Sequence, residues 1–255
     1  MKKILFNEDW YFKYNRIGSK PADIPPQKVN LPHDAVISLP CSEDGDRKKG
    51  FYPNVFVLYS KEVYVEPEWK GEYIVLQFDG VYKNSKVFVN GVYAGGNRCG
   101  YDRFFVEIHA LLKYGAKNLI SVEADTSCDS RWYSGAGIYR NVYLLRSGKI
   151  HFCPGKVKIN TEYADGEEAA LTARMDIKNE DILPCTVNVE IEFRDENGNI
   201  ACVSRRKVTL KEQAVTCANW KIYMDAPKLW DPENPHMYEC RVKLLDGDET
   251  VDEEL

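Results

Sequence analysis

The stretch Val87-Phe88-Val89-Asn90-Gly91-Val92-Tyr93-Ala94 sets an Asn-Gly pair between two short runs of β-branched and aromatic residues. Asn and Gly accept the positive φ angles of a type I′ turn, which joins antiparallel strands with the correct twist. This stretch therefore predicts a β-hairpin. The pairs Asn197-Gly198 and Asp246-Gly247 predict two further hairpins for the same reason.

Outward from this hairpin, short segments with two-residue alternation recur along the chain, and no long window keeps a helical period. The first half of the chain predicts strands near 55–65, 73–78, 85–89, 92–94, 104–108, 118–123 and 138–145, with one helical turn near 108–113. The second half predicts strands near 156–161, 169–178, 186–193, 200–210, 215–223 and 238–245. The fold class is therefore all-β.

The chain divides in two at a break in composition near Ser147-Gly148. Residues 1–148 form a larger predicted sandwich, which the proline-rich first 50 residues are expected to wrap as an extended edge, because proline cannot donate to a sheet ladder. Residues 149–255 carry about seven predicted strands in roughly a hundred residues, as an immunoglobulin-like sandwich does. We expect its last strand to be cut short at the end of the chain.

Composition narrows the classes of function that this chain can have. Its 255 residues carry a net charge of −5 with both signs mixed along the chain, and no basic stripe exists to follow a phosphate backbone. After Met1-Lys2-Lys3 only two aliphatic residues precede Asn7, so neither a signal peptide nor a membrane span is predicted. We expect a cytoplasmic protein without nucleic-acid or membrane partners.

The sequence shows no self-sufficient catalytic signature and no metal or cofactor motif. The eight cysteines are scattered, with no Cys-x-x-Cys pair, and are expected to be free thiols. The four histidines have no ligand spacing. Acidic residues at 43–46 and 248–254 are expected in solvated loops. We therefore predict no catalytic residue, no metal site and no cofactor.

One stretch has a composition suited to binding sugars, Arg131-Trp132-Tyr133-Ser134-Gly135-Ala136-Gly137-Ile138-Tyr139-Arg140. Aromatic rings stack on the apolar faces of sugar rings, and arginine donates to hydroxyls or carboxylates in a fork. The alternative interpretation is structural, with Trp132 and Tyr133 filling a core and the arginines making ion pairs.

That stretch resembles a signature of glycoside hydrolase family 2, which includes β-galactosidases, β-glucuronidases and β-mannosidases. Further motifs resemble those of the family in the same order along nearly the whole chain. They are Phe6-Asn7-Glu8-Asp9-Trp10-Tyr11-Phe12, Leu31-Pro32-His33-Asp34 with Ala35 where the family has tryptophan, Phe78-Asp79-Gly80-Val81, Val87-Phe88-Val89-Asn90-Gly91, and Pro227-Lys228-Leu229-Trp230-Asp231-Pro232-Glu233-Asn234-Pro235-His236-Met237-Tyr238. The resemblance implies a jelly-roll β-sandwich followed by an immunoglobulin-like β-sandwich.

The resemblance also implies which side chains touch the sugar. Asn54 lies five residues before Tyr59, as in the family's "N-P-x-G-x-Y" element, although Val55 and Val57 replace its proline and glycine. A second contact in β-galactosidase-type members is an acidic residue before the glycine bend. Arg131 occupies that position here, and Asp129 lies two residues earlier.

Three functions follow from these observations. The resemblance implies that the chain is the non-catalytic N-terminal portion of a retaining exo-β-glycosidase. In that case the chain shares its carbohydrate substrate with an absent (β/α)8 barrel, and a homo-oligomer is compatible with this interpretation. Alternatively it is a free-standing carbohydrate-binding module that stacks sugars on Trp132 and Tyr133. The third alternative is a protein-interaction sandwich without a role in sugar binding.

Overall fold

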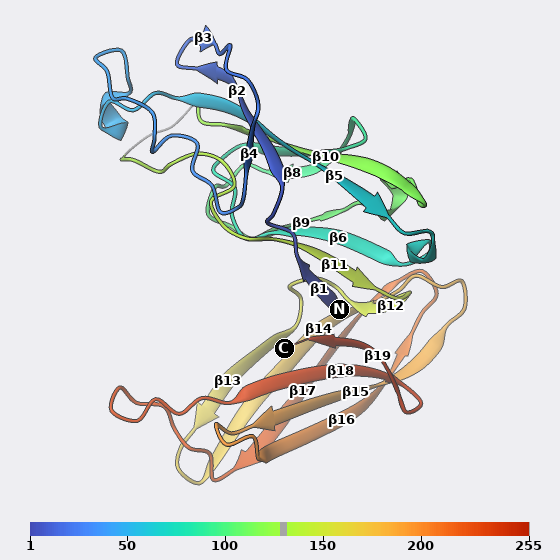
Figure 1. The fold of residues 1–255 in the computed structure, drawn as a ribbon. Helices are drawn as coiled ribbons and strands as arrows, with labels where there is room; N and C mark the ends of the chain where they lie inside the picture. The colour runs from blue at the N-terminus through green and yellow to red at the C-terminus, as the bar shows by residue number, and fades with distance from the viewer. Residues whose placement is uncertain (128–131, 255) are drawn as a thin grey trace. The chain divides into compact units, whose positions relative to one another are not determined.

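The computed structural model describes residues 1–127 and 132–254, and the chain separates into two compact units. One unit comprises Lys2–Arg146, and the other comprises Ser147–Leu255 together with Met1. Both are built from antiparallel β-sheets, and the helical content is limited to single 3-10 turns (Figure 1). The all-β fold class predicted from the alternating sequence pattern is confirmed.

The first unit is a sandwich of two sheets. Four strands form one sheet in the order β1 (Lys2–Leu5), β11 (Val142–Ser147), β6 (Tyr73–Phe78) and β9 (Phe104–Glu107). The larger sheet runs in the order β3 (Lys20–Pro21), β2 (Trp10–Ile17), β5 (Val55–Val65), β10 (Ala116–Asp125), β7 (Ser85–Val89) and β8 (Val92–Asn97), with β4 (Gln27–Val29) also paired to β2.

The predicted Asn90-Gly91 hairpin is confirmed as the turn between β7 and β8. Both turn residues have positive φ, 52° and 82°, as a type I′ turn requires. The predicted helical turn is a 3-10 turn at His109–Leu111.

The prediction of an extended edge for the first 50 residues holds only in part, because β1, β3 and β4 are edge strands but β2 is not. These residues contribute four strands, and β2 lies inside the larger sheet, where β5 pairs with one edge and β3 and β4 with the other. The reason is the alternation of Trp10, Phe12 and Tyr14, whose side chains are all buried. The prolines all follow this strand, so they do not interrupt its ladder.

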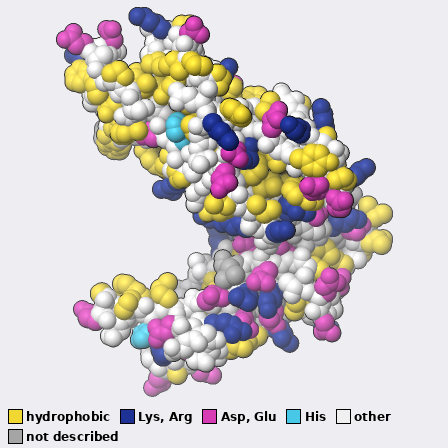
Figure 2. All heavy atoms as spheres, in the orientation of Figure 1, with side chains coloured by type: hydrophobic (Ala, Val, Ile, Leu, Met, Phe, Trp, Pro, Cys, Tyr) yellow, Lys and Arg dark blue, Asp and Glu magenta, His cyan; other side chains and the backbone are white. Residues whose placement is uncertain are grey.

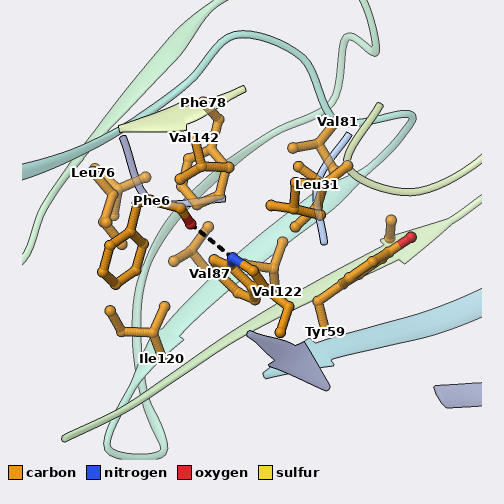
Figure 3. Packing of buried hydrophobic residues seen from close by; sticks show 14 of the residues in the cluster. Phe6, Leu31, Tyr59, Leu76, Phe78, Val81, Val87, Ile120, Val122 and Val142 are labelled. Atoms are coloured by element: carbon orange, nitrogen blue, oxygen red, sulfur yellow. Dashed lines mark hydrogen bonds between the residues drawn. The ribbon is translucent and has the colours of Figure 1, made fainter. Parts of the chain in front are cut away.

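The core of the first unit lies between its two sheets. Trp10, Tyr59, Phe78 and Ile120 are completely buried. Figure 3 shows Tyr59, Phe78, Ile120 and Phe6 within this cluster, with a hydrogen bond that ends on the Phe6 carbonyl. Its donor is the Trp10 indole Nε1, 2.8 Å away, so the largest core side chain also has its polar atom satisfied.

The second unit contains two four-stranded sheets. In one, β14 (Glu168–Asn179) pairs with β12 (Ile150–Phe152) and β13 (Lys158–Ala164) on one side and with β17 (Val215–Asp225) on the other. The other has the order β16 (Ile200–Leu210), β15 (Cys185–Arg194), β18 (Glu239–Asp246) and β19 (Glu249–Glu254). Its core includes Phe152, Met175, Ile177 and Ile191.

The predictions for residues 248–254 and 138–141 are wrong. The stretch expected to be a solvated acidic loop at 248–254 forms β19, because the Asp246-Gly247 turn folds it back on β18 and the carboxylate of Asp252 accepts from the buried Phe152 N–H at 2.8 Å. Residues 138–141, predicted as strand, precede β11, which begins at Val142. There the chain instead makes an isolated bridge at Gly137 to Tyr82.

Positive and negative side chains are mixed on the surface, as they are along the sequence. On the face drawn in Figure 2, side chains of both charges are interspersed over both units. Within residues 1–127 and 132–254 no helix is long and apolar enough to cross a membrane. Six of the described cysteines are free thiols, as the sequence predicts: Cys41, Cys99, Cys185, Cys202, Cys217 and Cys240.

Candidate functional site

Asp34, in the loop after β4, joins two segments that are far apart in sequence. Its Oδ1 accepts from the Val36 N–H at 2.8 Å and from the Ala136 N–H at 3.2 Å, and its Oδ2 accepts from the Tyr133 hydroxyl at 2.5 Å. Charge-assisted hydrogen bonds of this kind are the strong ones in proteins. We call Asp34, Val36, Tyr133 and Ala136 the Asp34 hub.

Two glycines let the bend after Tyr133 approach this hub closely. Gly135 has φ +71°, and a Cβ placed on it would lie 2.7 Å from Asp34 Oδ2. Gly137 has φ +100°, and its Cβ would lie 2.1 Å from the Tyr59 hydroxyl. No L side chain fits either place without movement of its surroundings. The glycines of the motif therefore shape the bend.

Tyr133 and Trp132 lie differently although they are neighbours in sequence. The Tyr133 ring is half-buried and packs on Tyr52, with centroids 5.0 Å apart. Its burial, followed by the hydrogen bond and charge of Asp34, raises the pKa of its phenol well above the usual range. The Trp132 side chain is 65% exposed. Of the two predicted stacking residues, Trp132 is thus the one whose side chain is open to solvent.

His33, beside Asp34 in sequence, ties this region to the core. Its Nδ1 lies 2.8 Å from the Tyr59 hydroxyl, and its backbone N–H donates to the Ile138 carbonyl at 2.8 Å. Burial lowers the pKa of His33, which favours the neutral imidazole. Burial likewise holds the pKa of Tyr59 well above its ordinary value, which keeps the phenol protonated.

Asn54 immediately precedes β5 and is fixed from both sides of its amide. Its Oδ1 accepts from the Nζ of Lys49 at 2.7 Å, and its Nδ2 donates to Asp46 Oδ2 at 3.4 Å. Lys49 is 3% exposed and belongs to a 3-10 turn, Arg47–Lys49, which Asp46 caps by accepting from the Lys48 N–H. A buried ammonium needs such a partner, so Lys49 fixes which end of the Asn54 amide faces it.

Asn54 also lines an open polar pocket of about 370 Å³. The other walls come from the end of β2, the loop before β5 and the end of β10, and comprise Arg16, Gly18, Ser19, Asp44, Gly45, Asp46 and Ser127. Arg16 is held by Asp125 at 3.2 Å and by the Ser127 hydroxyl at 2.5 Å. An amide, carboxylates, a guanidinium and hydroxyls together form a lining that can exchange hydrogen bonds with a polyol.

The remaining predicted contacts, Asp129 and Arg131, lie outside the described residues. Arg140, at the other end of the same motif, is exposed and lies over the Tyr139 ring, 5.3 Å from its centroid. Among the described residues, no group of three or more His, Cys, Asp or Glu side chains is arranged to hold a metal ion.

Sequence reasoning did not identify Asp34, Lys49 or Arg16 as residues that build this region. Asp34 lies in a motif quoted above but was given no role, since its partners Tyr133 and Ala136 are 99 and 102 positions away. In a loop of charged residues, the sequence does not distinguish a lysine that will be buried from one that will be exposed. Only the folded chain shows that Lys49 points inward.

Comparison with known families places the chain among carbohydrate-active proteins with two successive β-sandwich domains. The profile of the sugar binding domain of glycosyl hydrolases family 2 matches residues 7–148, and a second profile of the same family matches residues 151–254. The chain belongs to glycosyl hydrolases family 2, as the motifs in its sequence predict.

The names of similar proteins indicate two different activities, β-galactosidase and β-glucuronidase. A β-galactosidase of Bacteroides ovatus is 30% identical over 97% of this chain, which covers 30% of that protein. A β-glucuronidase of Bacteroides fragilis is 29% identical over 98% of this chain, which covers 36% of that protein. The chain therefore spans about a third of the length of these relatives and corresponds to their non-catalytic N-terminal portion.

Solved structures agree with this assignment. A family 2 glycosyl hydrolase from Bacteroides cellulosilyticus matches with a TM-score of 0.89 and 28% identity, covering 100% of this chain and 34% of its own. A β-glucuronidase from Bacteroides uniformis matches with a TM-score of 0.86 at 20% identity, over 99% of this chain and 31% of its own, which supports the fold alone.

Proposed function

We propose that this chain is the sugar-facing, non-catalytic front portion of a retaining exo-β-glycosidase of the β-galactosidase type. In this proposal it scaffolds the site and adds one or two side chains to its wall, while a (β/α)8 barrel supplies the reacting carboxyl groups. The chain alone then hydrolyses nothing. The names of its relatives leave β-galactosides and β-glucuronides as the two substrate classes to compare.

The observation that carries this proposal is the fixed orientation of Asn54. Lys49 Nζ occupies its Oδ1, and Asp46 takes one N–H of its Nδ2. Its second N–H has no partner among residues 1–127 and 132–254, and the residue lines the polar pocket. A donor that is held in place before the ligand arrives binds a hydroxyl at a lower entropic cost than a mobile one.

In a polypeptide that carries the catalytic barrel, Asn54→Ala is expected to lower kcat/KM for the preferred β-glycoside by about ten- to hundredfold. The reason is the loss of one oriented hydrogen bond to the sugar, since each factor of ten corresponds to about 1.4 kcal/mol. Steady-state kinetics with nitrophenyl β-galactoside and β-glucuronide measure the effect.

Asn219→Ala is the matched control, because Asn219 is exposed on β17 of the second unit. This control should leave kcat/KM unchanged for both substrates. An Asn54→Ala enzyme as active as its parent on both glycosides would contradict the assignment of Asn54 to the sugar site.

A further inference from the structure

A row of five side chains crosses the larger sheet of the first unit, one from each of five neighbouring strands. The Cα register pairs Tyr11 on β2 with Ser60 on β5, Ser60 with Ser121 on β10, Ser121 with Phe88 on β7, and Phe88 with Tyr93 on β8. Residues directly opposite one another in a sheet share a face. We call Tyr11, Ser60, Ser121, Phe88 and Tyr93 the aromatic row.

The aromatic row lies on the solvent face of the sheet. Its members alternate with buried neighbours such as Phe12, Tyr59 and Val122, which point into the core. Tyr11 and Tyr93 are 52% and 58% exposed, and neither contributes to the buried core cluster. The row is therefore accessible to a ligand within this unit, and its two tyrosines are not needed to fill the interior.

The arrangement of the row is aromatic at both ends and small and polar in the middle. Phe88 and Tyr93 pack edge to face, with centroids 5.7 Å apart, and form one platform. Tyr11 is the other platform, three strand spacings from Phe88, or about 14 Å at the usual separation of strands. Ser60 and Ser121 lie between the two platforms, and each carries a hydroxyl group.

This order is the reverse of a protein interface, whose apolar centre is surrounded by a polar rim. One adjacent row on the same face consists of Lys13, Leu58, Glu123 and Lys86, which mixes both charges around one half-buried leucine. On the other side of the aromatic row, Glu62 pairs with Leu119, which is 44% exposed. Mixed signs do not select a strongly charged ligand. Stacking platforms separated by hydroxyls suit a neutral ligand with apolar faces and many hydroxyl groups.

From this geometry we infer that the solvent face of β2, β5, β10, β7 and β8 binds a neutral, extended oligosaccharide along the aromatic row. One sugar ring stacks on Tyr11, another stacks on the Phe88–Tyr93 platform, and the hydroxyls between them reach Ser60 and Ser121. An extended chain is required because the row runs straight across the strands. The row shares no residue with the pocket of Asn54, so this inference does not rest on the proposed function.

The test is calorimetric titration of the 255-residue chain with β-1,4-linked glucose oligomers. We expect saturable binding of the hexamer with a Kd below about 1 mM, and at least about tenfold weaker binding of the dimer, which cannot reach both platforms. Tyr11→Ala and Tyr93→Ala should each weaken hexamer binding by at least about tenfold, since each removes a stacking ring.

Tyr64→Ala is the matched control, since Tyr64 is a 49% exposed tyrosine of β5 that pairs with Lys117 outside the row. Tyr64→Ala should leave hexamer affinity unchanged. Three results would overturn the inference: no saturable binding up to about 10 mM, equal affinity for dimer and hexamer, or equal losses in Tyr64→Ala and Tyr11→Ala. Self-association of the chain that Tyr11→Ala abolishes would also overturn it, by making a second copy the occupant.

Discussion

Gly137→Ala is expected to lower the free energy of unfolding of the first unit by about 2 to 5 kcal/mol, from backbone strain and overpacking together. Gly137 has φ +100°, and a Cβ there would lie 2.1 Å from the Tyr59 hydroxyl and 3.0 Å from its Cζ. Tyr59 is completely buried and cannot move away cheaply. Denaturant unfolding followed by tryptophan fluorescence measures the loss, because Trp10 lies in this core.

Gly91→Ala separates the two causes. Gly91 has φ +82° in the β7–β8 turn, but a Cβ there would meet nothing within 4 Å. Gly91→Ala should therefore lower the free energy of unfolding only by the conformational penalty of a positive φ, about 1 to 2 kcal/mol. Tyr59→Phe combined with Gly137→Ala should recover part of the loss, since it removes the nearest atom of the clash. Equal losses for Gly91→Ala and Gly137→Ala would show that the contact with Tyr59 is not the cause.

Asp34→Ala is expected to destabilise the first unit by about 2 to 4 kcal/mol, because it leaves the Val36 and Ala136 N–H groups and the Tyr133 hydroxyl without their acceptor. The Tyr133–Gly137 bend should then loosen, so proteolysis near Trp132 should become faster. Thermal unfolding and limited proteolysis with chymotrypsin measure the two effects.

Asp34→Asn keeps one acceptor oxygen and should cost less than Asp34→Ala. Asp44→Ala is the control for loss of charge, since Asp44 is an exposed acid in the loop before β5. If Asp34→Ala unfolds at the same temperature as Asp44→Ala, the Asp34 hub does not hold the bend.

Local chemistry accounts for the parts of the fold that the sequence predicts correctly. Asn90-Gly91 needs only its own positive φ angles to define a hairpin, and the boundaries of β5 and β7 follow from alternating side chains between turn residues. β6 is instead a short, largely apolar run whose six residues are all buried. The same rule applied to Trp10, Phe12 and Tyr14 would have identified β2. The prolines of this segment all follow β2, so their preference for sheet edges does not apply to it.

The candidate site was less predictable because its contacts are long-range. A family motif indicates Asn54, and composition indicates Trp132 and Tyr133, but neither indicates the partners that orient Asn54 and Tyr133. Asp34 meets Tyr133 across 99 positions, and the inward turn of Lys49 depends on how its loop packs before β5. Residues 138–141 have strand-like composition, yet the bridge of Gly137 to Tyr82 and the hydrogen bond from His33 to Ile138 hold this segment outside β11.

The proposed division of labour, in which this chain lacks hydrolytic activity of its own, is tested most directly by a hydrolysis assay. The purified 255-residue chain, shown to be folded by circular dichroism, is incubated with nitrophenyl β-galactoside and nitrophenyl β-glucuronide. Nitrophenol release is then compared with a buffer blank. We expect nitrophenol release no faster than the blank for both substrates. Turnover that scales with the concentration of the chain and disappears when the chain is denatured would contradict this expectation.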